Sequence, residues 1–210
     1  FQAVSMVTEY GFGVAVSADS DIKTMDQLIT WAKEHPGAFN IGVPATGSLP
    51  HFFGLMLSQQ IGSKGEIIGY RGSAPVITDL IGGILPVAID TLDVLTSQHQ
   101  GKRIRILATS GPKRSIYVPD VPTFAEQGFP ELTTEEWFGF YAPAATPKPV
   151  IAAANAAINA ALKEKSVIDS LAIVGLMPHG STPEEQARWQ KAEYDTWGPL
   201  IKKIGFTADS

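Results

Sequence analysis

Short apolar runs alternate with segments of helical periodicity along the first 136 residues, and this alternation is typical of an α/β fold. The apolar runs predict a strand at the very start of the chain, over 1–7. Further strands are predicted over 12–17, 39–43, 66–70, 84–89 and 103–109. Helices are predicted over about 25–34, 50–61 and 75–81.

Capping residues mark where several helices begin and end. Thr24 is expected to cap the first helix, with Gln27 completing a capping box, and His35-Pro36-Gly37 ends it. Thr182-Pro183-Glu184 is an equally clear start, because it places a cap, a proline and an early carboxylate in the favoured order. That last helix is expected to run to about Gly198 or slightly further.

The character of the chain changes after residue 136. Residues 110–136 are rich in proline and loop-like, and an aromatic strand is expected over 137–143. Helices follow over 149–163 and 166–174, before the one that starts at Thr182. The chain therefore divides into β/α units followed by a helical tail.

Composition excludes several classes of protein. The chain has 210 residues, a net charge of −5 and no cysteine. It is long enough for one globular unit or two small lobes. No run of about 18 apolar residues is present, so no membrane-spanning helix is expected. The absence of cysteine removes thiol nucleophiles, disulfides and cysteine zinc sites, and the absence of a basic cluster argues against nucleic acid as a partner.

Enzyme motifs are largely missing from the sequence. There is no GxSxG, HExxH or GxxxxGK[ST] motif, and Gly11-Phe12-Gly13 supplies only part of a dinucleotide fingerprint. The four histidines are scattered without metal-ligand spacing. We therefore expect no catalytic activity, no metal and no cofactor.

Two strand–turn–helix junctions are better candidates for a site. Thr46-Gly47-Ser48 precedes the helix at Pro50, and Gly72-Ser73-Ala74 precedes the helix at Pro75. Ligands of open α/β sheets collect at the carboxyl ends of strands, where a helix N-terminus offers free N–H groups to an anion. The two turns suit a small carboxylate, although each on its own is also compatible with an ordinary capped turn.

Six further residues are candidates for ligand contacts, each with a structural alternative. His51 lies in the first turn of its helix, where a histidine is more often structural than a ligand contact. Asp90 and Thr91 end a strand, and Asp90 either meets a ligand or caps the next turn. Phe12, Tyr70 and Trp137 could line a cleft or serve in packing.

Five segments carry a resemblance to a known family. They read VPATGSLPHFFG, YRGSAPVITDLIGG, RIRILATSGPKRSIYVPDVPTFAEQGFPEL, EEWFGFYAPAATPKPVI and GSTPEEQARW. In this order they resemble the extracytoplasmic solute receptors of the tripartite tricarboxylate transporters, the Bug family. The resemblance departs at Leu85-Pro86, where the family usually has valine and aspartate. A proline within the strand over 84–89 would indicate an edge or a bulge.

The resemblance implies a type II periplasmic-binding-protein fold of two lobes. The end of lobe one and the first crossing would occupy 1–13, lobe two 14–136, and the second crossing with the helices returning to lobe one 137–210. The implied function is periplasmic capture of a small carboxylate (a di- or tricarboxylate, an acidic amino acid or an aromatic acid) for a membrane permease. Thr46-Gly47-Ser48 would be one of the two loops that grip it.

The same resemblance implies that lobe one lacks its N-terminal part, because the family's other gripping loop is not in this sequence. We expect a further segment and a signal peptide upstream of Phe1. Without that segment, the helices after Pro149 would expose an apolar face and promote self-association.

One other function class remains open at this point. Ligand-sensing effector domains of LysR-type transcription regulators share the type II fold and have a similar length. No helix-turn-helix precedes the β/α units here, which favours the receptor. A signal peptide upstream in the gene would support the receptor, and a DNA-binding segment there would contradict it.

Overall fold

The computed structural model describes residues 1–63, 65–203 and 206–207. The chain forms two compact units, each described here by itself. Unit 1 joins Phe1–Tyr10 to Glu136–Ser210, and unit 2 is Gly11–Glu135. The lobe boundaries expected from the sequence lie at 13/14 and 136/137, and their assignment to lobes stays a prediction.

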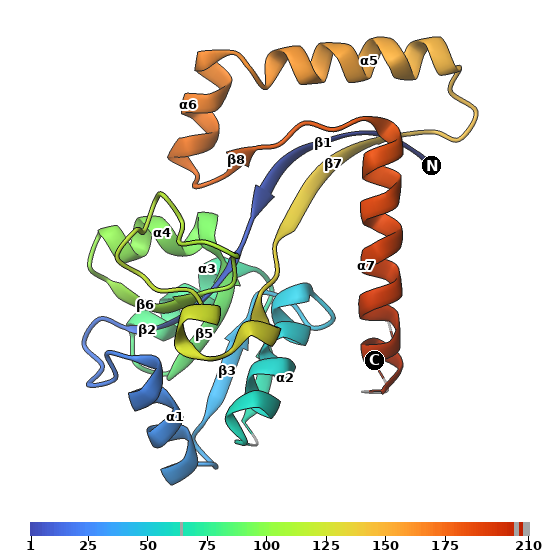
Figure 1. Cartoon of the computed structure of the whole chain (residues 1–210). Helices are drawn as coiled ribbons and strands as arrows, with labels where there is room; N and C mark the ends of the chain where they lie inside the picture. The colour runs from blue at the N-terminus through green and yellow to red at the C-terminus, as the bar shows by residue number, and fades with distance from the viewer. Residues whose placement is uncertain (64, 204–205, 208–210) are drawn as a thin grey trace. The chain divides into compact units, whose positions relative to one another are not determined.

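Unit 2 is built on a five-stranded sheet with the order β4-β3-β5-β2-β6 (Figure 1). Strand β3 runs parallel to β4 and β5, whereas β2 is antiparallel to both of its neighbours. The strands are β2 (Phe12–Ser17), β3 (Asn40–Val43), β4 (Glu66–Gly69), β5 (Val87–Thr91) and β6 (Ile104–Thr109). The helices are α1 (Met25–Glu34), α2 (Leu49–Ile61), α3 (Ser73–Ile81) and α4 (Leu92–Gln100).

Both faces of this sheet are covered by apolar side chains. On one face, Val76 and Leu80 of α3 and Leu95 of α4 belong to a cluster with Ala15 and Ala88 of the strands. On the other face, α2 packs against the sheet, and the rings of Phe12, Phe53 and Phe124 form a chain with centroids 5.6 and 5.4 Å apart. Burial on both faces explains the continuous apolar runs of β2, β3 and β5.

Most elements of unit 2 match the sequence-based expectations, including the Thr24 cap, whose hydroxyl accepts from the Gln27 N–H at 3.2 Å. Helix α4 was missed. The expected strand over 84–89 was wrong at its start, because the chain turns at Gly82–Pro86 and β5 begins only at Val87. Pro86 therefore causes neither an edge nor a bulge, and β5 is the central strand.

Unit 1 contains a three-stranded antiparallel sheet, β7-β1-β8, with helices packed on it. Its elements are β1 (Gln2–Tyr10), β7 (Glu136–Ala142), α5 (Lys148–Ala161), α6 (Lys165–Ile173), β8 (Met177–Pro178) and α7 (Pro183–Lys203). Gln186 of α7 is fully buried and joins two strands, since its Oε1 accepts from the Val4 N–H at 3.1 Å and its Nε2 donates to the Phe140 carbonyl at 3.2 Å. Helix α7 continues through Pro199 to Lys203, slightly further than Gly198, as the sequence allows.

Many apolar side chains of unit 1 are exposed. Helix α5 buries Ile151, and no described residue of α6 is buried. Val150 is 53% and Ile173 is 84% exposed. A cavity of about 920 Å³ lies against α5, α7 and the start of β1. Several apolar side chains on the helices after Pro149 are therefore exposed, and whether they form the single apolar face that the resemblance implies stays a prediction.

Candidate ligand-binding site

The chain connections of unit 2 diverge at one point of its sheet. From β3 the chain passes through α2 to β4, on one side, and from β5 it passes through α4 to β6, on the other side of the sheet. The carboxyl ends of β3 and β5 therefore form a topological switch point, which is where open α/β sheets place their ligands. Figure 1 shows α2 beside β3.

The two turns singled out in the sequence are brought together at this edge. The Gly72 N–H donates to the Pro44 carbonyl at 2.7 Å, and the Tyr70 N–H donates to the Val43 carbonyl at 2.9 Å. The contact is so close that a Cβ on Gly69 would lie 2.7 Å from the Thr46 backbone nitrogen and would also strike the Thr46 hydroxyl. Thr46 therefore lies beside the turn that leads into α3.

Internal hydrogen bonds shape the turn before α2. Gly47 has a φ of 77°, and its N–H donates to His51 Nδ1 at 3.0 Å. The Ser48 hydroxyl donates to the Ala45 carbonyl at 2.7 Å and does not cap the helix. Since Nδ1 accepts a hydrogen bond, the His51 ring is neutral here, and burial lowers its pKa further. Through this hydrogen bond His51 holds the turn in a fixed conformation, and a ligand contact for His51 stays a prediction.

Asp90 occupies a buried position at the end of β5. Its side chain is 1% exposed, and its Oδ1 accepts from the Thr91 N–H at 2.8 Å. Its Oδ2 has no hydrogen-bond partner among the described residues. Burial raises the pKa of Asp90, with a smaller contribution from the charge of Asp93, while the Thr91 N–H and the Ser73 hydroxyl act in the opposite direction. Asp90 therefore lies next to the first residue of α3.

The three aromatic candidates have other contacts. Phe12 is 1% exposed and packs on Phe53, which leaves it no surface for a ligand. The Tyr70 hydroxyl donates to Asp79 Oδ2 at 2.8 Å. Trp137 belongs to unit 1, where its Nε1 donates to Glu193 at 2.7 Å. A ligand role for these three stays a prediction that their contacts do not favour.

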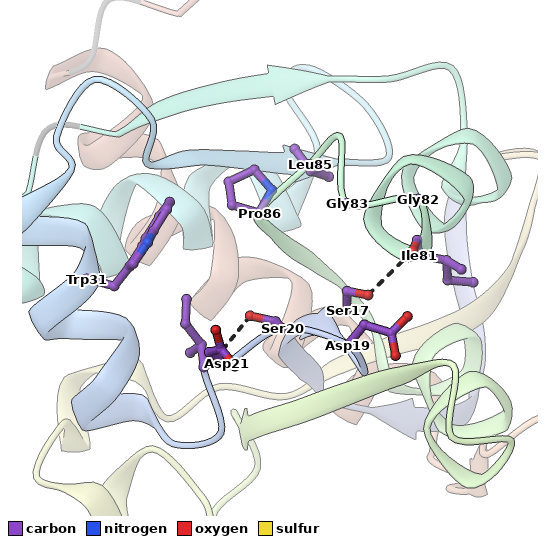
Figure 2. A pocket seen from close by; sticks show the side chains of 11 residues that line it. Ser17, Asp19, Ser20, Asp21, Trp31, Ile81, Gly82, Gly83, Leu85 and Pro86 are labelled. Carbon is purple, nitrogen blue, oxygen red and sulfur yellow. Dashed lines mark hydrogen bonds between the residues drawn. The ribbon is translucent and has the colours of Figure 1, made fainter.

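A cavity of unit 2 lies away from this edge. Figure 2 shows this cavity, of about 450 Å³, between the loop after β2, Trp31 of α1 and the turn after α3. Ser17, which lines it, ends β2, and Pro86 immediately precedes β5. The cavity is therefore at the opposite end of these strands from Asp90, and none of the candidate residues lines it.

The assembled edge suits binding better than catalysis. It offers helix N-termini and hydroxyl groups, which complement an anion. Among the described residues no cluster of histidine, aspartate and glutamate could hold a metal ion. The helices in the described ranges also lack the length and apolarity that crossing a membrane requires.

Comparisons with known proteins agree with this picture. Residues 1–206 match the model of the "Tripartite tricarboxylate transporter family receptor". The chain is 30% identical over 202 residues to the protein BugT of Bordetella pertussis, covering 96% of this chain and 62% of that protein. The chain spans about three fifths of the length of the curated relatives it matches.

Solved structures show the same fold. A periplasmic transporter superposes with a TM-score of 0.91 at 33% identity, covering 97% of this chain and 68% of the other. A protein of R. palustris solved with adipate superposes with a TM-score of 0.90 at 29% identity, covering 98% and 69%. The expected α/β fold of periplasmic binding proteins is confirmed.

These matches also decide between the classes of function. The family and the similar proteins are solute-binding receptors and not enzymes, as the sequence predicts. The match along residues 1–206 favours a receptor over the effector domain of a LysR-type regulator. The chain therefore belongs to the receptor family of the tripartite tricarboxylate transporters.

Proposed function

We propose that the protein is a periplasmic receptor that captures a small carboxylate at the switch point of unit 2 and delivers it to a tripartite tricarboxylate-type membrane permease. The observation that carries the proposal is the meeting of the turn at Thr46 with the turn at Gly72, each at the N-terminus of a helix. The adipate bound to the R. palustris protein, which is similar along nearly the whole chain, supports a carboxylate as the ligand.

Elementary electrostatics favours this ligand class. The N-termini of α2 and α3 each stabilise a nearby negative charge by about 0.3–1 kcal/mol. Hydrogen bonds from hydroxyl and N–H groups to a carboxylate are stronger than those to neutral acceptors. The exposed Thr46 hydroxyl and the Ser73 hydroxyl lie at these helix starts. Di- and tricarboxylates, acidic amino acids and aromatic acids all carry the group that this edge would hold.

Isothermal titration calorimetry tests the proposal. We expect saturable one-to-one binding of at least one carboxylate from a panel of adipate, malate, aspartate, glutamate and benzoate. Adipamide, which keeps the chain length of adipate but carries no charge, serves as the matched control and is expected not to bind. Absence of binding by every carboxylate, or equal binding of adipate and adipamide, would contradict the proposal.

We further propose that the exposed apolar face of unit 1 associates with a second copy of the chain. Val150, Ile173 and Val174 are 53%, 84% and 45% exposed, and surfaces of this kind promote association. Light scattering of the 210-residue chain is expected to give a mass above the 22.4 kDa of one copy. A monomer with a single cooperative melting transition would argue against association.

A further inference from the structure

Asp90 poses an electrostatic problem for a site that takes an anion. Its carboxylate is buried at the carboxyl end of β5, and Ser73, at the N-terminus of α3, lies beside it. Within the described ranges, Oδ2 accepts no hydrogen bond. A ligand carboxylate at the start of α3 would add a second negative charge near the first, in surroundings where water screens charges poorly.

We propose that Asp90 takes up a proton from solvent when an anionic ligand binds at this edge of the sheet. The proton goes to Oδ2, which has no partner in the part of the chain that the structure describes, while Oδ1 keeps its hydrogen bond from the Thr91 N–H. The charge of the ligand then replaces that of Asp90, so the total charge of the buried edge stays the same. This inference rests on the proposed function, because it requires an anion at the start of α3.

The sheet position of Asp90 explains why the carboxylate is so enclosed. In the antiparallel pair β2–β5, Asp90 lies opposite Gly13, so both residues face the side of the sheet that α3 and α4 cover. A Cβ on Gly13 would already meet Leu95 at 2.8 Å. The leucines of α4 thus close this face beside Asp90, and an unpaired charge there is costly.

Few other ionisable groups surround Asp90. Strands β2 and β3 carry no ionisable side chain. Helix α4 contributes Asp93, whose negative charge opposes ionisation of Asp90, and α3 contributes Asp79, which accepts from the Tyr70 hydroxyl. Helices α2 and α4, which both contact β5, carry His51 and His99, whose rings accept the Gly47 and Ile106 N–H groups. Arg71 lies two positions before Ser73 in the turn that leads into α3, but the groups that influence the pKa of Asp90 include no cation, so no described positive charge acts as its counter-ion.

The sign of the pH dependence follows from this arrangement. Burial already raises the pKa of Asp90 in the free protein, and a bound anion raises that pKa again. Below the pKa of the free state, Asp90 is protonated before the ligand arrives and no proton is taken up. At a pH between the pKa of Asp90 in the free protein and its pKa in the complex, Asp90 takes up as much as one proton for each ligand that binds. The affinity is therefore highest in acid and falls by up to about tenfold per pH unit as the pH rises through this window.

Calorimetric titration with adipate in two buffers of different ionisation enthalpy measures this proton directly. We expect uptake of up to one proton per bound adipate in the parent protein, and uptake close to zero in Asp90→Asn. Asn keeps the shape of the side chain and its Oδ1 acceptor, so binding should persist and lose most of its pH dependence. Asp93→Asn is the matched control, in which proton uptake remains and its window moves to lower pH.

The outcomes separate the two proposals. Binding without proton uptake overturns the role of Asp90 and leaves the proposed function intact. Uptake that persists in Asp90→Asn assigns the proton to another group, such as His51, and is equally contradictory. Absence of binding by every carboxylate overturns both proposals. If Asp90→Asn does not fold, the pKa of Asp90 is measured in the parent protein by carboxyl ¹³C NMR, with and without adipate. The proposal requires this pKa to rise when adipate binds, and an unchanged pKa overturns it.

Discussion

Replacing Gly69 with valine lowers the affinity for the carboxylate ligand by about tenfold or more. Gly69 ends β4, and any Cβ there would lie 2.7 Å from the Thr46 backbone nitrogen and would overlap the Thr46 side chain. Backbone atoms cannot move aside as a flexible side chain can, so the turn at Thr46–Ser48 must shift away from α3. The loss of one hydrogen bond to a charged ligand costs about 1.5–3 kcal/mol, which corresponds to this change in affinity.

The control for Gly69→Val is a glycine at which a valine side chain meets no neighbouring atom. Gly37 lies in the turn before β3, and a Cβ there would meet nothing within 4 Å. Gly37→Val is therefore expected to bind the ligand like the parent protein. Gly69→Val should also unfold at lower temperature, since overpacking costs about 1–3 kcal/mol. If Gly69→Val folds and binds the carboxylate as tightly as Gly37→Val, the turns at Thr46 and Gly72 do not hold the ligand jointly.

Replacing Glu136 with glutamine stabilises the protein at alkaline pH. Glu136 begins β7 in unit 1, is 5% exposed, and its Oε1 has no hydrogen-bond partner among the described residues. Burial raises the pKa of Glu136 to about 8, and the charge of Glu193 adds to the effect. A carboxyl with this pKa is protonated in the folded protein at neutral pH, whereas it is ionised in the unfolded chain.

The direction of the effect follows from the raised pKa. Because the folded state binds more protons than the unfolded state between pH 4.5 and about 8, the stability of the parent protein falls as the pH rises through this range. Above it, ionised Glu136 costs up to roughly 5 kcal/mol. Glutamine cannot ionise, so Glu136→Gln should match the parent near pH 4 and exceed it most at pH 9.

Urea unfolding at several pH values measures this difference. The exposed Glu131 supplies the control, and Glu131→Gln should leave the stability nearly unchanged at every pH. A gap between Glu136→Gln and the parent that does not vary with pH would contradict the account of Glu136 as a buried, protonated carboxyl.

Local signals in the sequence were sufficient for most of the fold. The apolar runs located the strands of the sheet in unit 2, since burial on both faces requires them. Helix α4 was missed because its sequence, LDVLTSQHQ, has little apolar periodicity and buries only Leu92, Leu95 and Thr96. Thr91 at its start and Gly101 after its end were signals that could have revealed it.

The candidate site depended more on tertiary structure. Helix-start chemistry indicated both turns, but only the strand order shows that they meet at a switch point. The same order places Pro86 before the central strand and not at an edge. Sequence spacing also could not show that His51 accepts from the Gly47 N–H, or that Trp137 pairs with Glu193 within unit 1. These contacts depend on side-chain directions that a one-dimensional pattern does not contain.

Amide NMR during a titration with adipate tests the central claim most directly. Glycines lie both at the switch point of unit 2 and beside the cavity at the opposite end of its sheet, so their amide signals distinguish the two places. The account predicts that the amide resonances of Gly47, Gly72 and Ser73 shift in a saturable way. The resonances of Gly82 and Gly83, beside the cavity at the opposite end of the sheet, should stay in place. Shifts concentrated at Gly82 and Gly83, with Gly47, Gly72 and Ser73 unaffected, would contradict a carboxylate site at the switch point.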